Sequence, residues 1–272
     1  MPEKITIACF GLSGFGNDLL DTLYTINDSN LGNNQTEFEI ECLYTRKNKS
    51  DHLYYSNQSL ETLAEKHALR ITYVPQKGDW DCAPADLAIV STFHRILKTK
   101  HLSRFNRIIN IHPSLLPSYQ GATPTHWMIE NNETIVGVSA HLMKEEVDSG
   151  PIIFQKKMLN PQLNDNQLRK ALSFLSKEIV RDIVNNFPNY TVLSSNYTPS
   201  SQPPRSTCNA TLNLNDITSI NTLISHIQCY TPHPMPKLEV DKKIFIIDFT
   251  NPTVTLNITV ASENFALMGY WE

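Results

Sequence analysis

The sequence predicts an α/β protein, with a mostly parallel sheet and helices on both of its faces, followed by a small β-rich domain. Three observations lead to this prediction. The first half of the chain alternates short β-rich runs with helical patterns. Residues 198–204, TPSSQPP, then interrupt regular structure, and the segment that follows consists mainly of strand patterns.

The elements expected in the first half form successive βαβ units. Helical periodicity covers 18–26 and 59–67. The runs rich in β-branched and apolar residues, which we expect to be strands, are 4–10, 38–44, 71–74, 87–91 and 107–111. Because parallel strands need a crossover between them, this alternation favours a doubly wound sheet.

The second half contains two further strands, a long helix and the expected domain boundary. Strands are predicted at 136–142 and 151–158, and a helix at 165–186. We therefore divide the chain into domains 1–197 and 198–272. In the second domain the patterns indicate a helix at 217–230 and strands at 243–249, 253–259 and 265–271. The apolar run 265–271 is expected to be an exposed edge that could pair in a homodimer.

Composition narrows the class of function. The chain has 272 residues, 40% hydrophobic and 18% charged, as in ordinary soluble proteins. Its net charge of −4 argues against a protein that depends on nucleic-acid binding, and no apolar run reaches membrane-spanning length. Five scattered cysteines without metal-ligand spacing indicate a reducing cytoplasm and no metal site.

An amide, an imidazole and a carboxylate form the most informative group of side chains. Asn110 and His112 lie two residues apart, so they point to the same side of an extended segment, and Pro113 ends that strand. Asp148 stands in the later segment VDSG. Without a Ser or Cys nucleophile, these groups suit acyl transfer to an external amine: Asn110 holds an oxyanion, His112 moves a proton and Asp148 orients the imidazole. Taken alone, such residues more often only satisfy backbone groups in turns.

A longer pattern distinguishes these two interpretations. Residues 110–155 read NIHPSLLPSYQGATPTHWMIENNETIVGVSAHLMKEEVDSGPIIFQ, which resembles the signature of the 10-formyltetrahydrofolate-dependent formyltransferases. The resemblance implies a Rossmann-like catalytic domain, and a catalytic triad of Asn110, His112 and Asp148. It also implies 10-formyltetrahydrofolate as co-substrate. The pterin contacts that it implies lie in two segments, at Phe93, Ile96 and Leu97 and at Lys144 and Val147.

The acceptor site is less clearly marked. After the first predicted strand, GLSGFG has the spacing GxxGxG and the next strand lacks an acidic ribose partner, so a tight turn is favoured over a dinucleotide site. In the family this loop borders the acceptor, which makes Ser13 and Phe15 candidate contacts. Further candidates are Gly121, Thr123 and Tyr230, although core packing is the usual role for such an aromatic residue. Family members often carry Arg where Gln120 stands.

The predicted acceptor is the amine of a dTDP- or UDP-linked amino deoxy sugar, in glycan biosynthesis. The negative charge and the compact C-terminal segment motivate this choice. Two alternatives remain open at this point. One is a methionyl-tRNA formyltransferase, which should have a more basic surface. The other is a non-catalytic module that binds folate or a sugar nucleotide, and the complete triad argues against it. His141, on a predicted strand, is expected to be a satisfied core residue.

Overall fold

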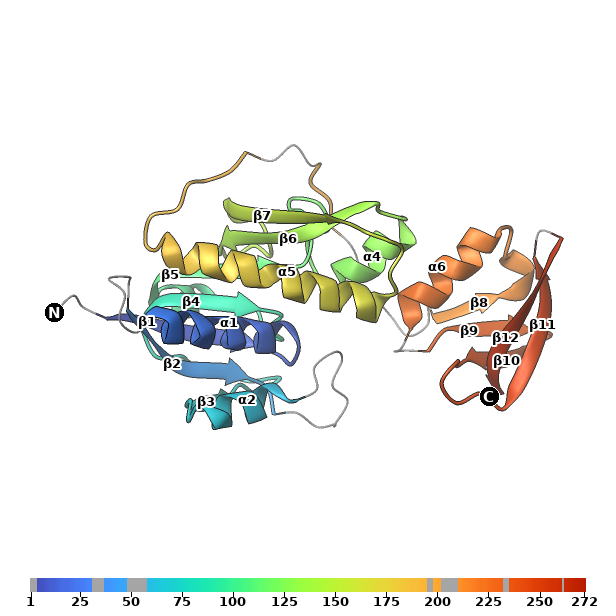
Figure 1. The fold of residues 1–272 in the computed structure, drawn as a ribbon, viewed down its shortest axis with the longest axis horizontal. Coiled ribbons are helices and arrows are strands. Elements are labelled where there is room, and N and C mark those ends of the chain that lie inside the picture. The colour runs from blue at the N-terminus through green and yellow to red at the C-terminus, as the bar shows by residue number, and fades with distance from the viewer. Residues whose placement is uncertain are drawn as a thin grey trace. The chain divides into compact units, whose positions relative to one another are not determined.

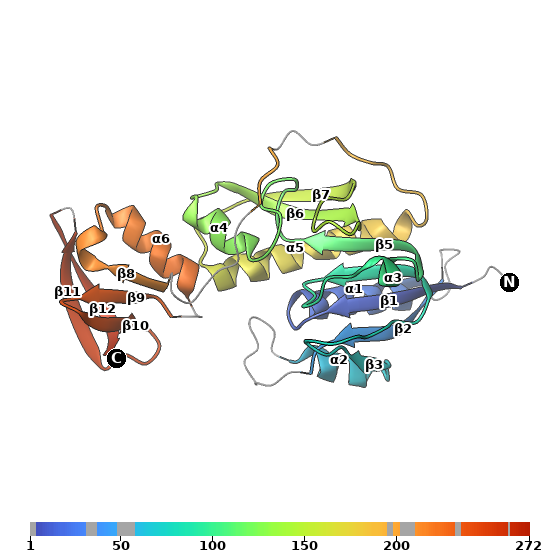
Figure 2. The same ribbon diagram turned by 180° about the vertical axis from the view of Figure 1, so that it is seen from behind.

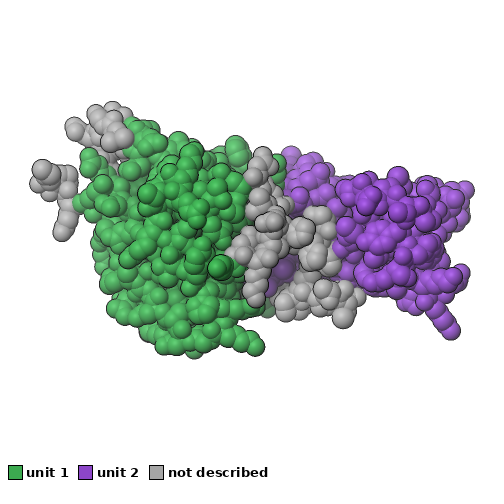
Figure 3. All heavy atoms as spheres, turned by 90° about the horizontal axis from the view of Figure 1, so that it is seen from below, with its two compact units in different colours: residues 1–120, 136–158, 169–201 green, residues 121–135, 159–168, 202–272 purple. Residues whose placement is uncertain are grey.

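The computed structural model describes residues 4–30, 37–47, 58–194, 198–201, 210–231, 235–260 and 262–272. The chain divides into two compact units, which are coloured separately in Figure 3. The first contains residues 1–120, 136–158 and 169–201, and the second contains 121–135, 159–168 and 202–272. The second unit therefore includes, besides the C-terminal segment, two stretches that precede the boundary expected at 198.

The first unit is built on a seven-stranded sheet of order β3-β2-β1-β4-β5-β6-β7. Strands β1 to β5 run parallel to their neighbours, whereas β6 pairs antiparallel with β5. The central strands β1 and β4 are buried along most of their length, as expected for a parallel sheet covered on both faces. The predicted α/β fold class is confirmed. The strands are β1 (Ile5–Gly11), β2 (Phe38–Thr45), β3 (Ile71–Tyr73), β4 (Ala85–Ser91), β5 (Phe105–His112), β6 (Ile135–Leu142) and β7 (Ile152–Leu159).

Three helices lie close to predicted positions: α1 (Phe15–Asn30), α2 (Leu60–Lys66) and α5 (Asp165–Asn185). The short α3 (Thr99–Leu102) is not predicted. Figures 1 and 2 show α1 and α5 on the same face of the sheet, where Lys177 Nζ lies 3.0 Å from Asp18 Oδ1. The Ser59 side chain begins α2 by accepting a hydrogen bond from the amide of Thr62. No helix in the described part of the chain is long and apolar enough to cross a membrane.

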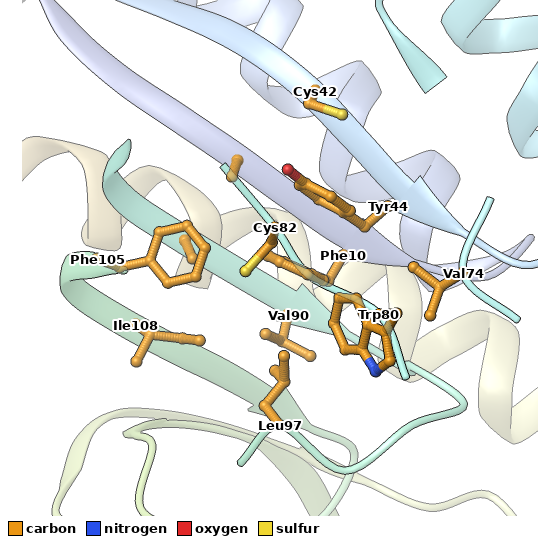
Figure 4. Packing of buried hydrophobic residues seen from close by; sticks show 12 residues of the cluster. Phe10, Cys42, Tyr44, Val74, Trp80, Cys82, Val90, Leu97, Phe105 and Ile108 are labelled. Carbon is orange, nitrogen blue, oxygen red and sulfur yellow. The ribbon is translucent and has the colours of Figure 1, made fainter. Parts of the chain in front are cut away.

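An aromatic cluster fills the core beside the carboxyl half of β1 (Figure 4). Phe10 stacks on Tyr44, with ring centroids 4.5 Å apart, and meets Trp80 and Phe93 edge to face. Leu97, after β4, is 2% exposed and belongs to the same cluster. This packing anchors the start of the loop that leaves β4, and so fixes one of the two segments assigned to the pterin.

The second unit carries a five-stranded sheet of order β11-β12-β10-β9-β8. The strands are β8 (Thr211–Asn213), β9 (Lys237–Val240), β10 (Lys243–Ile247), β11 (Val254–Val260) and β12 (Glu263–Trp271), and the helices are α4 (Pro124–Glu130) and α6 (Ile220–Tyr230). Leu223 of α6 packs with Leu238, Phe245 and Leu267 of the sheet in one apolar core. Ser219 begins α6 by accepting from the amide of Thr222.

One prediction about this sheet is wrong. The apolar pattern of 265–271 predicts an exposed edge, but β12 lies between β11 and β10 and pairs with both. Its apolar residues are explained by this interior position, since Leu267 is 5% exposed and belongs to the core of the unit. Among the described strands, β11 and β8 form the two edges of the sheet.

Candidate active site

The first unit brings Asn110, His112 and Asp148 together at the end of β5. Asn110 and His112 project from the last residues of that strand, and Asp148 follows β6 in a loop. Asn110 Nδ2 donates to Asp148 Oδ1 at 3.0 Å, and His112 Nδ1 lies 3.3 Å from Asp148 Oδ2. Both groups thus converge on one carboxylate, in agreement with their two-residue spacing.

The carboxylate and the imidazole are shielded from solvent. The side chains of His112 and Asp148 are 6% and 9% exposed. Burial lowers the pKa of His112 below its ordinary value, while the Asp148 carboxylate and the Tyr119 carbonyl act in the opposite direction. The second ring nitrogen, Nε2, donates to the Tyr119 carbonyl at 2.8 Å. Burial thus favours the neutral ring, whereas the acceptors that face its two nitrogens favour the doubly protonated one.

His141 is a fourth member of this network. Its Nε2 accepts from Asn110 Nδ2 at 3.1 Å and lies 3.4 Å from Asp148 Oδ1, and the side chain is 1% exposed. Its Nδ1 lies 3.2 Å from the Leu142 carbonyl. The sequence predicts His141 to be a core residue; the structure agrees that it is buried and adds that it touches the amide of Asn110.

The loop that carries Asp148 is held in place by backbone contacts. Asp148 has a left-handed backbone with φ of 51°, a conformation that Asp tolerates better than most residues. Gln120 Nε2 donates to the Asp148 carbonyl at 3.0 Å. Gly150 lies so close to β6 that a Cβ there would stand 1.6 Å from the Leu142 carbonyl oxygen. The glycine of the VDSG segment is therefore required for this close approach.

A buried hydrogen-bond network supports the loop that follows His112. Gln155 Nε2 donates to the Leu116 carbonyl at 2.7 Å and to Ser139 Oγ at 2.9 Å. Ser139 Oγ in turn donates to the Ser114 carbonyl and accepts from the Leu116 amide. These bonds connect β6 and β7 to the loop, so side chains of the sheet fix the segment that leads to Tyr119, the partner of His112.

The two segments assigned to the pterin are joined by a side chain. Glu145 Oε1 accepts from the amide and the hydroxyl of Thr99, which links the loop after β6 to the start of α3. On these segments Ile96 is 63% exposed and Val147 is 51% exposed, and Lys144 is also exposed. Leu97 is buried and can offer a ligand little more than its backbone groups, whereas Phe93 packs on Phe10 and is only partly buried.

The residues predicted to contact the acceptor are divided between the two units. Ser13 Oγ accepts from the Leu60 amide at 3.2 Å, and Phe15 is 1% exposed in the core. Gly121 and Thr123 lie in the second unit, both with positive φ, immediately before α4. Tyr230 is 4% exposed, and its ring packs on His126 and His226 in that unit. The side chains of Phe15 and Tyr230 thus serve core packing.

Comparison with known proteins assigns the family. A family model described as "Formyl transferase" matches residues 30–184, more than half of the chain. The chain therefore belongs to the formyl transferase family. Among curated relatives, a methionyl-tRNA formyltransferase of Thermotoga neapolitana is 41% identical over 106 residues, which are 38% of this chain and 34% of that protein. The chain thus matches about a third of the length of this relative.

Solved structures resemble the chain over nearly its whole length. A sugar N-formyltransferase from a Shewanella species has a TM-score of 0.66 and 18% identity, and the match covers 92% of this chain and 99% of that one. An N-formyltransferase from Helicobacter canadensis, solved with folinic acid and dTDP-3-aminofucose, also has a TM-score of 0.66, with 17% identity over 98% of this chain and 100% of its own. At these identities the likeness concerns the fold alone.

Within the described residues, no group of three or more His, Cys, Asp and Glu side chains is arranged to hold a metal ion. The four cysteines that the structure describes, at positions 9, 42, 82 and 229, are free and buried. Cys208 lies outside the described residues.

Proposed function

We propose that this protein moves a formyl group from 10-formyltetrahydrofolate to the amine of a nucleotide-linked amino deoxy sugar. The observation that carries the proposal is the convergence of Asn110, His112 and Asp148 in one buried network. These groups can bind a developing oxyanion and move protons without forming a covalent acyl-enzyme. Membership of the formyl transferase family supports the choice of a formyl group as the acyl unit.

Two features support a reduced folate as the donor. The segments that contain Ile96 and Val147 are tied together through Glu145 and Thr99, and each presents an exposed apolar side chain. Such side chains, with backbone groups between them, suit a flat heteroaromatic ring. The structurally similar enzyme from Helicobacter canadensis was solved with folinic acid.

The proposed acceptor is a dTDP- or UDP-linked amino sugar, used in glycan biosynthesis. The resemblance to the Helicobacter canadensis enzyme, which was solved with dTDP-3-aminofucose, extends over 98% of this chain and includes the C-terminal segment. Residues 209–272 contain three lysines, no arginine and six acidic residues. A surface that binds tRNA would need more positive charge.

In the proposed reaction the neutral sugar amine attacks the formyl carbon. A C–N bond forms to the amine, and the carbonyl oxygen becomes an oxyanion that Asn110 and protonated His112 stabilise. The ammonium proton passes to Asp148, directly or through water. Once neutral, Asp148 holds the Asn110 N–H less strongly, so this donor becomes available to the oxyanion. The bond from the formyl carbon to N10 then breaks, N10 takes up the proton that Asp148 received, directly or through water, and a formamide and tetrahydrofolate leave.

Methionyl-tRNA formyltransferase is the second candidate. The 41% identity to the Thermotoga neapolitana protein over 106 residues favours it. The donor and the triad would be unchanged in this case, and only the acceptor would differ. A direct comparison of the two acceptors therefore separates the two candidates.

The test supplies the purified chain with 10-formyltetrahydrofolate and a panel of dTDP- and UDP-amino sugars, and detects products by mass spectrometry. Charged initiator tRNA is tested in parallel. We expect formylated sugar and no formyl-methionyl-tRNA; the opposite result would establish the second candidate. Asn110→Ala should lower kcat by about 100-fold or more. Equal activity in wild type, Asn110→Ala, His112→Ala and Asp148→Ala would defeat the catalytic assignment. Absence of turnover by the wild type with every acceptor would favour a binding module.

We further propose that the protein acts in the cytoplasm and as a homodimer through its C-terminal domain. The four free, buried cysteines support a reducing compartment.

A further inference from the structure

Strand β11 is a long edge without the features that usually protect one. Within the described residues it has a strand neighbour on one side only, β12. Edge strands present unpaired backbone N–H and C=O groups, and proteins commonly shield them with charges, Pro or short length. The seven residues of β11, VTLNITV, contain neither charge nor Pro, whereas the opposite edge, β8, has only three residues.

The sequence of β11 reads almost identically in both directions from Asn257. Leu256 and Ile258 flank this centre, Thr255 and Thr259 come next, and valines stand at both ends. Two antiparallel copies related by a two-fold axis through Asn257 would therefore place like residues opposite each other. Thr255 would face Thr259 of the second copy, and Leu256 would face its Ile258. Thr–Thr and β-branched pairs of this kind stabilise antiparallel strands.

The two faces of the strand also match in such a pair. Ile258 and Val260 are buried in the core of the second unit, with Leu256 packed against it. Thr255, Asn257 and Thr259 are exposed on the other face. A two-fold axis perpendicular to the sheet keeps each face on its own side. The apolar rows of the two copies would then continue into each other, and so would the polar rows.

One exposed apolar side chain is explained by the same pairing. Val254 is the first residue of β11 and lies on the same face as Leu256, Ile258 and Val260, but it is 40% exposed. In the two-fold arrangement it lies opposite Val260 of the second copy and would lose part of this exposure.

We propose that β11 is a homodimer interface, in which two copies of this chain pair antiparallel in the register centred on Asn257. The proposal moves the interface from 265–271 to the strand that forms the observed edge, and it specifies the register. It is independent of the proposed formyl transfer, because no residue of the candidate active site takes part.

The test uses two double variants that change the same two exposed positions. In the double variant Thr255→Lys with Thr259→Lys, lysines face each other at both symmetry-related contacts. We therefore expect the dissociation constant of the dimer to rise about 10-fold or more. In Thr255→Lys with Thr259→Glu, opposite charges face each other, and the dimer should persist. Sedimentation over a range of concentrations measures the mass, with 30.9 kDa for one chain and twice that for the dimer.

Cross-linking checks the register. With Asn257→Cys the two introduced thiols lie opposite each other, so an oxidant should produce a disulfide-linked dimer. Thr255→Cys is the matched control, because its partner would be Thr259 and little cross-linking is expected. A wild-type chain that stays monomeric at all concentrations would overturn the proposal. So would a dimer that survives the Lys/Lys variant, or one that both charge variants dissociate equally while each retains the wild-type circular dichroism spectrum.

Discussion

Asn110 of β5 lies directly opposite His141 of β6 in the antiparallel register, and Asn110 Nδ2 is 3.1 Å from His141 Nε2. The same amide nitrogen of Asn110 also donates to Asp148. The amide that would meet the oxyanion is therefore oriented from two sides. His141 acts through Asn110, so we regard it as a positioning residue.

His141→Leu should lower kcat by roughly 10- to 100-fold with KM values changed little, since a loosely held Asn110 is misplaced mainly in the transition state. His141→Gln keeps an acceptor for the Asn110 N–H and should recover most of the activity. Steady-state kinetics of both variants provide the measurement. A purely structural role predicts instead that both variants lose thermal stability in proportion to their loss of activity.

The relation between Asn110 and His141 also shows what the sequence alone conveys. The spacing of Asn110 and His112 predicts that both point to one side, because alternation within one strand is local. The contact with His141 depends on the pairing of β5 with β6, and no pattern within either strand encodes that register. The sequence draws attention to His141 only through its place in the signature.

The secondary structure likewise contains elements that local sequence patterns predict and features that they do not. Strands and helices with strong periodicity are predicted to within a few residues, for example the helix at 165–186, observed as α5. The short strands β8 and β9 are missed, because three or four residues such as TLN or KLEV carry too little pattern. The position of β12 inside its sheet is predicted wrongly, since strand order depends on contacts between segments distant in sequence.

Gly150→Ala should destabilise the protein by about 3 kcal/mol or more, because the new Cβ would overlap the Leu142 carbonyl and the neighbouring backbone must move. The same movement displaces Asp148, so the activity that remains at a temperature where the variant is folded should also fall. Gly78→Ala is the control: a Cβ at this position would meet no other atom within 4 Å, and the positive φ should cost only about 1 kcal/mol. Chemical denaturation measures both.

Gln120→Ala should lower kcat by about 10-fold, since the Asp148 carbonyl loses its side-chain donor and the loop becomes less well positioned. Gln120→Arg retains N–H donors at this position and should keep more activity than Gln120→Ala. If the two variants have equal kcat values, the hydrogen bond to Asp148 does not position the loop.

The lowered pKa of His112 predicts a pH dependence of stability. In the unfolded chain His112 titrates near 6.5, whereas in the folded protein burial lowers its pKa. The unfolded state therefore binds more protons between the two values, so the free energy of unfolding falls as pH drops below about 6.5. His112→Gln removes this contribution. Urea unfolding at about pH 8 and about pH 5.5 should show a smaller loss for the variant, and equal losses would contradict the prediction.

Ile96→Asp and Val147→Asp test the proposed folate site. Both side chains are more than half exposed, so little change in stability is expected. If they cover the pterin ring, each substitution removes apolar contact worth about 1.5 kcal/mol or more, and should raise KM for 10-formyltetrahydrofolate at least about 10-fold. KM for the acceptor should stay within about 2-fold, because the acceptor binds elsewhere.

Phe174→Asp is the control for these variants, since Phe174 on α5 is 71% exposed and lies outside both folate segments. It should leave both KM values unchanged. Binding of a non-reactive reduced folate, followed by fluorescence, separates a loss of affinity from a loss of turnover. Unchanged folate affinity in Ile96→Asp and Val147→Asp would place the pterin away from these segments. This conclusion would hold even if the triad variants were inactive, because different residues test the donor site and the chemical step.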